Sequence, residues 1–180
     1  MVTESDRYDL LLAGGHVIDP RNRIDGKRDI AIRNGCIAAV GENIERGDAK
    51  AVRDVAGLMV TPGLIDIHTH IYHKATSYGV DPGPIAARSV VATMVDAGSA
   101  GAGNFAGLRD FIFARSPFRL LAYLNISYPG IFAFDRDFVF GEASIRELLS
   151  VERCVETATQ NRDVIVGIKV RLGSNTTGAI

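Results

Sequence analysis

The sequence has 180 residues, of which 47% are hydrophobic, so it is long enough to bury a substantial core. Its net charge is −1, with Lys and Arg scattered among Asp and Glu, and this balance excludes a basic surface for nucleic acid or for an anionic membrane. Its two cysteines, Cys36 and Cys154, are too few for a disulfide framework, and no apolar segment is long enough to cross a membrane. We therefore expect a cytoplasmic protein with reduced thiols and a small-molecule partner.

The first sixty residues predict short strands that are separated by turn residues. Asn34-Gly35 is the strongest hairpin signal, because a type I′ turn requires positive φ at both central positions. Gly14-Gly15 is expected to separate two strands. The expected strands are 10–13, 16–18, 29–32, 36–40 and 51–55. Together they predict a small β module.

From residue 60 onward, apolar runs alternate with helical stretches. The runs are apolar almost throughout, which is typical of parallel strands buried on both faces, and they cover 63–70, 92–98, 120–127 and 164–171. Helices are expected near 84–91, 104–115 and 144–160. Ser144 is expected to begin the last helix, since Glu147 three residues later completes a capping box. This alternation predicts an α/β domain with right-handed connections.

Two histidines end the first of these strands, in the segment TPGLIDIHTH (61–70). Because side chains alternate along a strand, His68 and His70 point to the same face, about 7 Å apart, and can converge on one ion. They lie at the carboxyl end of the strand, where α/β folds assemble their active sites. The alternative is a pair of histidines that are satisfied by backbone partners.

Lys169 lies in DVIVGIKVR, a strand that is otherwise so apolar that a lone ammonium group is poorly placed. One interpretation is a lysine that extends its amine to solvent from the strand end. The other is a lysine with an uncharged amine, which can take up carbon dioxide to become an anionic carbamate.

Other polar residues near the strand ends are candidates for supporting a ligand or contacting a substrate: Asp66, His73, Asp96, Asn125 and Arg171. Asp66 either orients a ligand histidine or is a buried cap or turn partner. Arg171 shares the face of Lys169, and either binds a substrate carboxylate or is solvated at the strand end. The glycine-rich segment 96–103 matches no phosphate-binding motif, and it predicts a tight turn between a strand and a helix.

Five segments of the chain resemble the amidohydrolase superfamily, and in particular its deacetylase-type metallohydrolases related to dihydroorotases and D-aminoacylases. These segments are LLAGGHVIDPRNRIDGKRDIAIRNGCIAAVG, GLMVTPGLIDIHTH, VDAGSAG, YLNIS and GIKVR, and the resemblance covers nearly the whole chain. It implies an α/β fold in which residues 1–60 form part of a small β-sandwich. Residues 61–180 would form the first half of a (β/α)₈ TIM barrel.

The resemblance also implies a metal centre. His68 and His70 resemble the ligands on the first barrel strand. Lys169 resembles the carboxylated lysine of the fourth strand, which bridges two divalent metal ions, expected here to be Zn²⁺. Two further ligand histidines and a catalytic aspartate are expected beyond residue 180, so no catalytic residue is identified within the sequence.

The activity implied by the resemblance is metal-dependent hydrolysis of amide bonds, in N-acyl or cyclic amides, with esters as an extension. The full-length protein is expected to be a homo-oligomer that acts on a small molecule. Two alternatives stay open: a noncatalytic barrel relative that serves as a scaffold or binding protein, and an inactive amino-terminal fragment of the enzyme.

Overall fold

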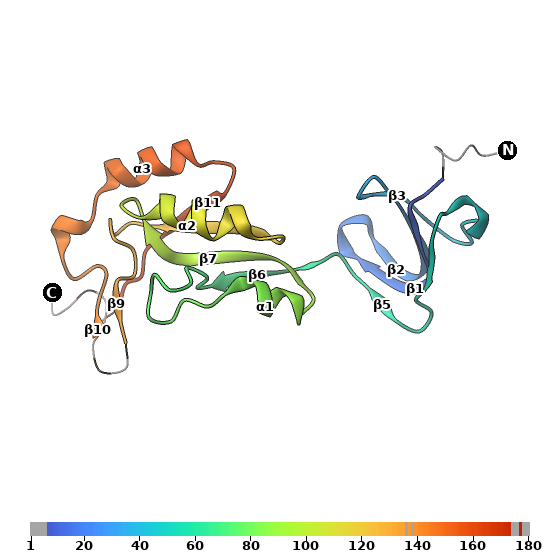
Figure 1. Ribbon diagram of the computed structural model, residues 1–180, viewed down its shortest axis with the longest axis horizontal. Coiled ribbons are helices and arrows are strands. Elements are labelled where there is room, and N and C mark those ends of the chain that lie inside the picture. Colours follow the sequence, from blue (N-terminus) through green and yellow to red (C-terminus); the bar gives the residue numbers. More distant parts are fainter. Residues whose placement is uncertain (1–6, 136, 138, 174–176, 178–180) are drawn as a thin grey trace. The chain divides into compact units, whose positions relative to one another are not determined.

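The computed structural model describes residues 7–135, 137, 139–173 and 177. The chain divides between Pro62 and Gly63 into two compact units, each with its own main sheet. The elements of both units can be followed by colour along the chain in Figure 1. In the described part of the chain, no helix reaches the length and apolarity of a membrane-spanning segment.

The first unit is a five-stranded sheet with the strand order β3-β2-β1-β4, in which β5 also pairs with β1. Its strands are β1 (Leu10–Asp19), β2 (Ile24–Arg33), β3 (Cys36–Gly41), β4 (Val52–Asp54) and β5 (Met59–Val60), and its 3₁₀ helices are η2 (Pro20–Asn22) and η3 (Arg46–Asp48). Strand β1 is antiparallel to β2 and parallel to β4 and β5. Leu11, Ala31 and Ala49 form one cluster of its buried core.

Asn34-Gly35 and Gly14-Gly15 were both expected to separate strands in this unit, and only the first pair does so. The turn at Asn34-Gly35 is confirmed, since φ is 53° at Asn34 and 72° at Gly35. The predicted break at Gly14-Gly15 is wrong, because β1 runs through both residues. The register with β2 shifts between Leu12 and Gly15, and φ is 76° at Gly14. These glycines therefore form a bulge within one strand.

The second unit contains the four predicted parallel strands. They are β6 (Leu64–Thr69), β7 (Val91–Gly101), β8 (Arg119–Asn125) and β11 (Ile165–Lys169), in the order β11-β8-β7-β6. All three pairings are parallel, which confirms the prediction of parallel strands in sequential order. A short antiparallel hairpin of β9 (Ala133–Phe134) and β10 (Val139–Phe140) was not predicted.

The helices of this unit are α1 (Pro82–Ala87), α2 (Phe105–Phe111) and α3 (Val151–Gln160), with 3₁₀ helices η4 (Phe113–Arg115) and η5 (Arg146–Leu148). They pack on one face of the sheet, as β8 shows. Its alternate residues Leu120, Ala122 and Leu124 lie in two buried clusters. These clusters contain Ala86 of α1, Phe105 and Leu108 of α2, and Cys154 of α3.

The predicted start of the last helix at Ser144 is wrong. The helix begins after Ser150, whose hydroxyl accepts a hydrogen bond from the Arg153 N–H. Ser144 instead lies in a turn, where its N–H donates to the Gly141 carbonyl. Leu148 and Leu149 pair with the backbone after β8, so tertiary contacts hold this stretch out of the helix despite its capping-box pattern.

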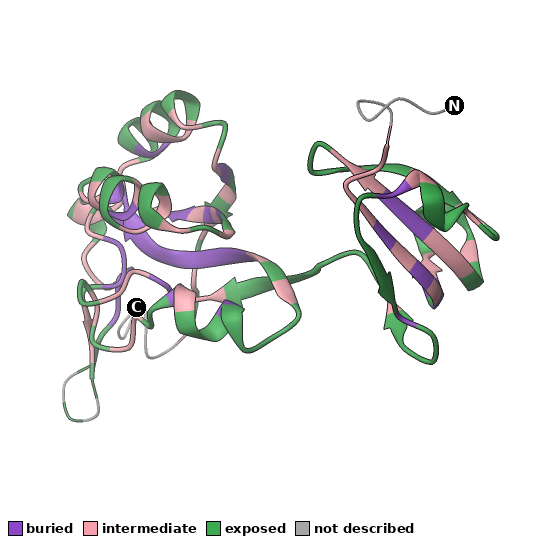
Figure 2. Ribbon diagram, turned by 45° about the vertical axis from the view of Figure 1, so that its right-hand side comes forward, coloured by how far each residue is buried: buried purple, intermediate pink, exposed green. Residues whose placement is uncertain are grey.

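The two outer strands of the second sheet are open at their edges. β7 is buried from Met94 to Gly101, whereas β6 is largely exposed (Figure 2). Ile65 in β6 is 61% exposed, and Ile168 in β11 is 46% exposed. Each outer strand therefore combines unpaired backbone groups with exposed apolar side chains, a combination that favours association with another strand.

We expect the 180-residue chain to self-associate through these edges. Sedimentation velocity should show a sedimentation coefficient that rises with protein concentration, and the Ile65→Lys, Ile168→Lys double variant should shift the protein towards monomer. Phe111→Lys is the matched control, because Phe111 is 63% exposed but lies on α2. A wild-type chain that stays monomeric at every concentration would contradict the prediction.

Candidate functional site

The carboxyl ends of the four parallel strands meet at one end of the second sheet. Lys169 is the register partner of Asn125, and Thr69 is the register partner of Asp96. The sequence-predicted residues around 66–70, 96, 125 and 169–171 therefore come from neighbouring strands at the same end of the sheet. This is the end at which α/β folds bind ligands.

A wide bulge in β7 shapes this end of the sheet. Ala97 pairs with Tyr123 and Gly101 with Asn125, so four steps along β7 oppose two steps along β8, and two residues are extra. Gly98, at the start of the bulge, has φ 87°. The predicted turn at 96–103 is wrong for residues 96–101, because β7 continues to Gly101, and the turn is confined to the residues that follow.

The bulge brings Ser99 to the second histidine of the pair. The Ser99 Oγ lies 2.9 Å from His70 Nδ1, and Ser99 is fully buried. A bulge of this kind can redirect a side chain that a regular strand would place elsewhere. The sequence analysis did not identify Ser99, because its role depends on this irregular backbone.

The two histidines lie side by side, and His70 is the more buried of them. Their ring centroids are 5.6 Å apart. Burial lowers the pKa of His70 to about 4, and the neighbouring charges of His68, Lys169 and Arg171 act in the same direction. The His70 imidazole is therefore neutral at physiological pH.

Lys169 packs against the backbone of Gly98. A Cβ at position 98 would lie 2.6 Å from Lys169 Cγ, so no larger residue fits there without displacing the lysine. Asn125 completes this contact, since its Nδ2 donates to the Gly98 carbonyl at 3.0 Å. The glycine, the amide and the lysine thus fix three strands relative to one another.

The two candidate aspartates bind backbone N–H groups. Asp96 is fully buried, and its carboxylate accepts from Ile71 N at 2.9 Å and from Ser99 N at 2.6 Å. Burial raises the pKa of Asp96, while these N–H groups act in the opposite direction. Asp66 Oδ1 accepts from His68 N at 3.1 Å. Asp96 therefore fixes the bulge, and Asp66 fixes the backbone of the strand that carries the histidines.

Arg171 is paired within the protein. Its Nη2 donates to Glu142 Oε2 at 2.8 Å, and its guanidinium carbon lies 5.2 Å from the Phe134 ring centroid. The Tyr78 ring stands between His70, at 4.7 Å, and Phe134, at 5.1 Å. The sequence analysis identified neither Tyr78 nor Glu142, because their contacts join residues that are far apart in the sequence.

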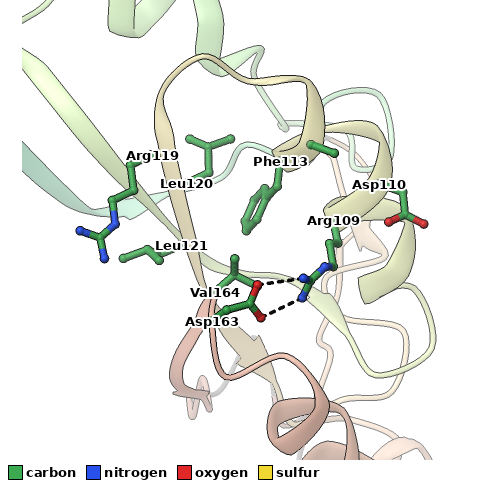
Figure 3. A pocket seen from close by; sticks show the side chains of 9 residues that line it. Arg109, Asp110, Phe113, Arg119, Leu120, Leu121, Asp163 and Val164 are labelled. Carbon is green, nitrogen blue, oxygen red and sulfur yellow. Dashed lines mark hydrogen bonds and ion pairs between the residues drawn. The ribbon is translucent and has the colours of Figure 1, made fainter. Parts of the chain in front are cut away.

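His68 and His70 line neither of two hollows in the surface of the second unit. His73 lines one of about 260 Å³, together with Asp81 and Phe111. The other, of about 360 Å³, is shown in Figure 3 and lies where β8 begins, at the end of the sheet opposite to Lys169. It is crossed by a bidentate ion pair between Arg109 and Asp163, which supports the chain between α3 and β11.

No known family profile matches the chain. The sequence is 35% identical to a deacetylase of Brucella anthropi over 159 residues, which cover 86% of this chain and 38% of the relative. It is also 35% identical to a deacetylase of Agrobacterium fabrum over 148 residues, which cover 81% of this chain and 35% of that protein.

The fold matches solved structures over almost the whole chain. A dihydroorotase crystal structure superposes with a TM-score of 0.81 and 33% identity, covering 95% of this chain and 44% of the other. The chain belongs to the amidohydrolase superfamily. The chain spans only 38% of the length of the Brucella anthropi deacetylase.

We expect Gly98→Ala to destabilise the protein more than a substitution that only strains the backbone. Gly35→Ala is the matched control, since φ is 72° at Gly35 and a Cβ there would meet nothing within 4 Å. This control should cost roughly 1–2 kcal/mol. Gly98→Ala should cost roughly 1–3 kcal/mol more, because its methyl group collides with Lys169. Equal losses in urea unfolding would show that the contact with Lys169 is unimportant.

Proposed function

We propose that the chain is the amino-terminal half of a metal-dependent hydrolase that cleaves amide bonds. In this proposal residues 61–180 supply the first half of a (β/α)₈ barrel, and residues 1–60 contribute to a small β-sandwich. The main support is the site itself: His70 is neutral, bonded through Nδ1 to Ser99, and adjacent to His68 at the carboxyl end of β6. The similarity to proteins named deacetylase and dihydroorotase supports the reaction class.

The histidine pair fits a divalent metal ion. A metal binds the neutral form of imidazole, and the low pKa keeps His70 in that form. Because Nδ1 is engaged with the Ser99 hydroxyl, Nε2 is the ring nitrogen that remains for an ion. Ser99, held in turn by Asp96, fixes the orientation of the ring.

Further donors have to come from a different residue type or from other segments. In the described ranges, no group of three or more His, Cys, Asp or Glu is placed to hold an ion. Lys169 is our candidate, since a lysine amine that has lost its proton can add carbon dioxide and release a second proton, which gives a carbamate with two donor oxygens. Two more histidines and an aspartate would come from segments outside these 180 residues.

In the proposed centre, His68, His70 and the carboxylated Lys169 would hold two Zn²⁺ ions. When bound, such a pair supplies a water that ionises near neutral pH, and it polarises a substrate carbonyl. The chain itself contributes orientation: Ser99 fixes one ligand ring, and Gly98 leaves the space that Lys169 occupies. The proposed substrates are N-acyl or cyclic amides, and esters by extension.

Zinc titration by calorimetry tests the histidine ligands. The His68→Ala, His70→Ala double variant should lose zinc binding, whereas Ser99→Ala should retain it with an affinity roughly tenfold weaker, as expected for a residue that orients a ligand. His16→Ala is the control, since His16 lies in β1 and pairs with Asp25. Zinc binding by the double variant that equals wild type would remove the metal assignment.

Lys169→Ala in the full-length protein tests the bridging role. We expect the variant to lose metal and turnover together, because the anionic bridge between the two ions is absent. A short-chain carboxylate such as propionate should partly restore both by occupying the vacated position. Lys74→Ala, in the loop after β6, is the matched control. If Lys169→Ala keeps wild-type metal content and turnover, this lysine does not bridge metals.

A further inference from the structure

Two buried polar atoms beside His70 have no hydrogen-bond partner in the part of the chain that the structure describes. They are the Tyr78 hydroxyl and Glu142 Oε1. Glu142 is only 2% exposed, and its other carboxylate oxygen accepts from Arg171. Buried polar atoms are nearly always hydrogen-bonded in native proteins, so both atoms indicate a polar partner that the described residues do not supply.

Ring and ion contacts gather these two groups beside the histidine pair. The Tyr78 ring lies against both His70 and Phe134, and the Arg171 guanidinium lies over the other end of this aromatic row. The Ser77 hydroxyl donates to the Phe134 carbonyl. The loop after β6 and the β9–β10 hairpin are therefore joined next to His70, with Tyr78 contributed by the loop and Glu142 by the segment after the hairpin.

The charges of this cluster indicate which ligand it suits. The Arg171 guanidinium already binds the Glu142 carboxylate, so an anionic substrate group would have to displace an internal ion pair. Among the described residues, two buried atoms of this cluster have no hydrogen-bond partner: Glu142 Oε1 is an acceptor, and the Tyr78 hydroxyl is able to donate. An amide with a free N–H presents the matching donor and acceptor. An ester of the same shape presents acceptors only, and its bridging oxygen would be repelled by the carboxylate.

We propose that Glu142 and Tyr78 form a binding subsite that selects amides with a free N–H over the corresponding esters. In this subsite Glu142 Oε1 accepts from the substrate N–H, and the Tyr78 hydroxyl donates to a substrate oxygen. The inference rests on the proposed function, because it names the substrate class of the same site. It assigns specificity to two residues that the sequence analysis did not identify.

Binding to the metal-free protein tests the subsite without catalysis. The probes are N-benzylacetamide and benzyl acetate, which differ by N–H against O, and their affinities for the EDTA-treated full-length protein are measured by ligand-observed NMR. Wild type should bind the amide at least about tenfold more tightly, as expected for a hydrogen bond to a charged acceptor. Equal affinity for the two probes, or no binding of either, would overturn the inference.

Two conservative variants separate the two roles. Glu142→Gln keeps the side-chain shape and should lose most of the preference for the amide. Tyr78→Phe keeps the ring contacts. It should weaken the affinity for both probes by roughly fivefold, because a neutral hydrogen bond to a substrate oxygen is removed. Tyr128→Phe is the control, since Tyr128 is 46% exposed. A full amide preference in Glu142→Gln, or wild-type affinities in Tyr78→Phe, would contradict the assignment.

Measuring hydrolysis of the same amide by the zinc-loaded protein distinguishes the proposed hydrolase function from the proposed subsite. Preferential binding of the amide without its hydrolysis would refute the proposed function and leave the subsite in place. Hydrolysis without preferential binding would refute the subsite alone.

Discussion

Lys169 lies against a glycine backbone, and the arrangement of the carboxyl end of the sheet depends on that contact. Because position 98 carries no side chain, β7 can approach the lysine of β11 and can adopt the positive φ that begins the bulge. The bulge in turn directs Ser99 to His70, and the Asn125 amide holds the Gly98 carbonyl. Gly98 thereby links the backbone geometry of β7, β8 and β11 to the orientation of His70, which follows β6.

The features that could be predicted from the sequence are those that depend on neighbours along the chain. Four apolar runs of strand length identified the parallel strands, because burial on both faces leaves an unbroken apolar pattern. Asn34-Gly35 identified a turn, because few residue pairs adopt positive φ together. The alternation of His68 and His70 placed two imidazoles together, and the rings are indeed adjacent.

The features that could not be predicted depend on contacts between distant segments. Ser144 has a capping-box pattern, but pairing of Leu148 and Leu149 with the backbone after β8 prevents a helix there. Glu142 and Arg171 are 29 residues apart, and neither residue alone indicates that the other neutralises it. Ser99 lies in a segment whose glycines indicate a turn, whereas two extra residues of a bulge bring its hydroxyl to His70.

The strand order has a thermodynamic consequence for the proposed centre. His68 lies on β6, His70 directly follows that strand, and Lys169 lies on β11. β6 and β11 are the two outer strands of the sheet, with β7 and β8 between them. An ion held by donors from both outer strands would couple the positions of these two strands. Its binding free energy would then add to the stability of the arrangement that brings the donors together, and a change that separated the donors would weaken its affinity by the same amount. Strand arrangement and ion affinity would in this way be reciprocal properties of one sheet.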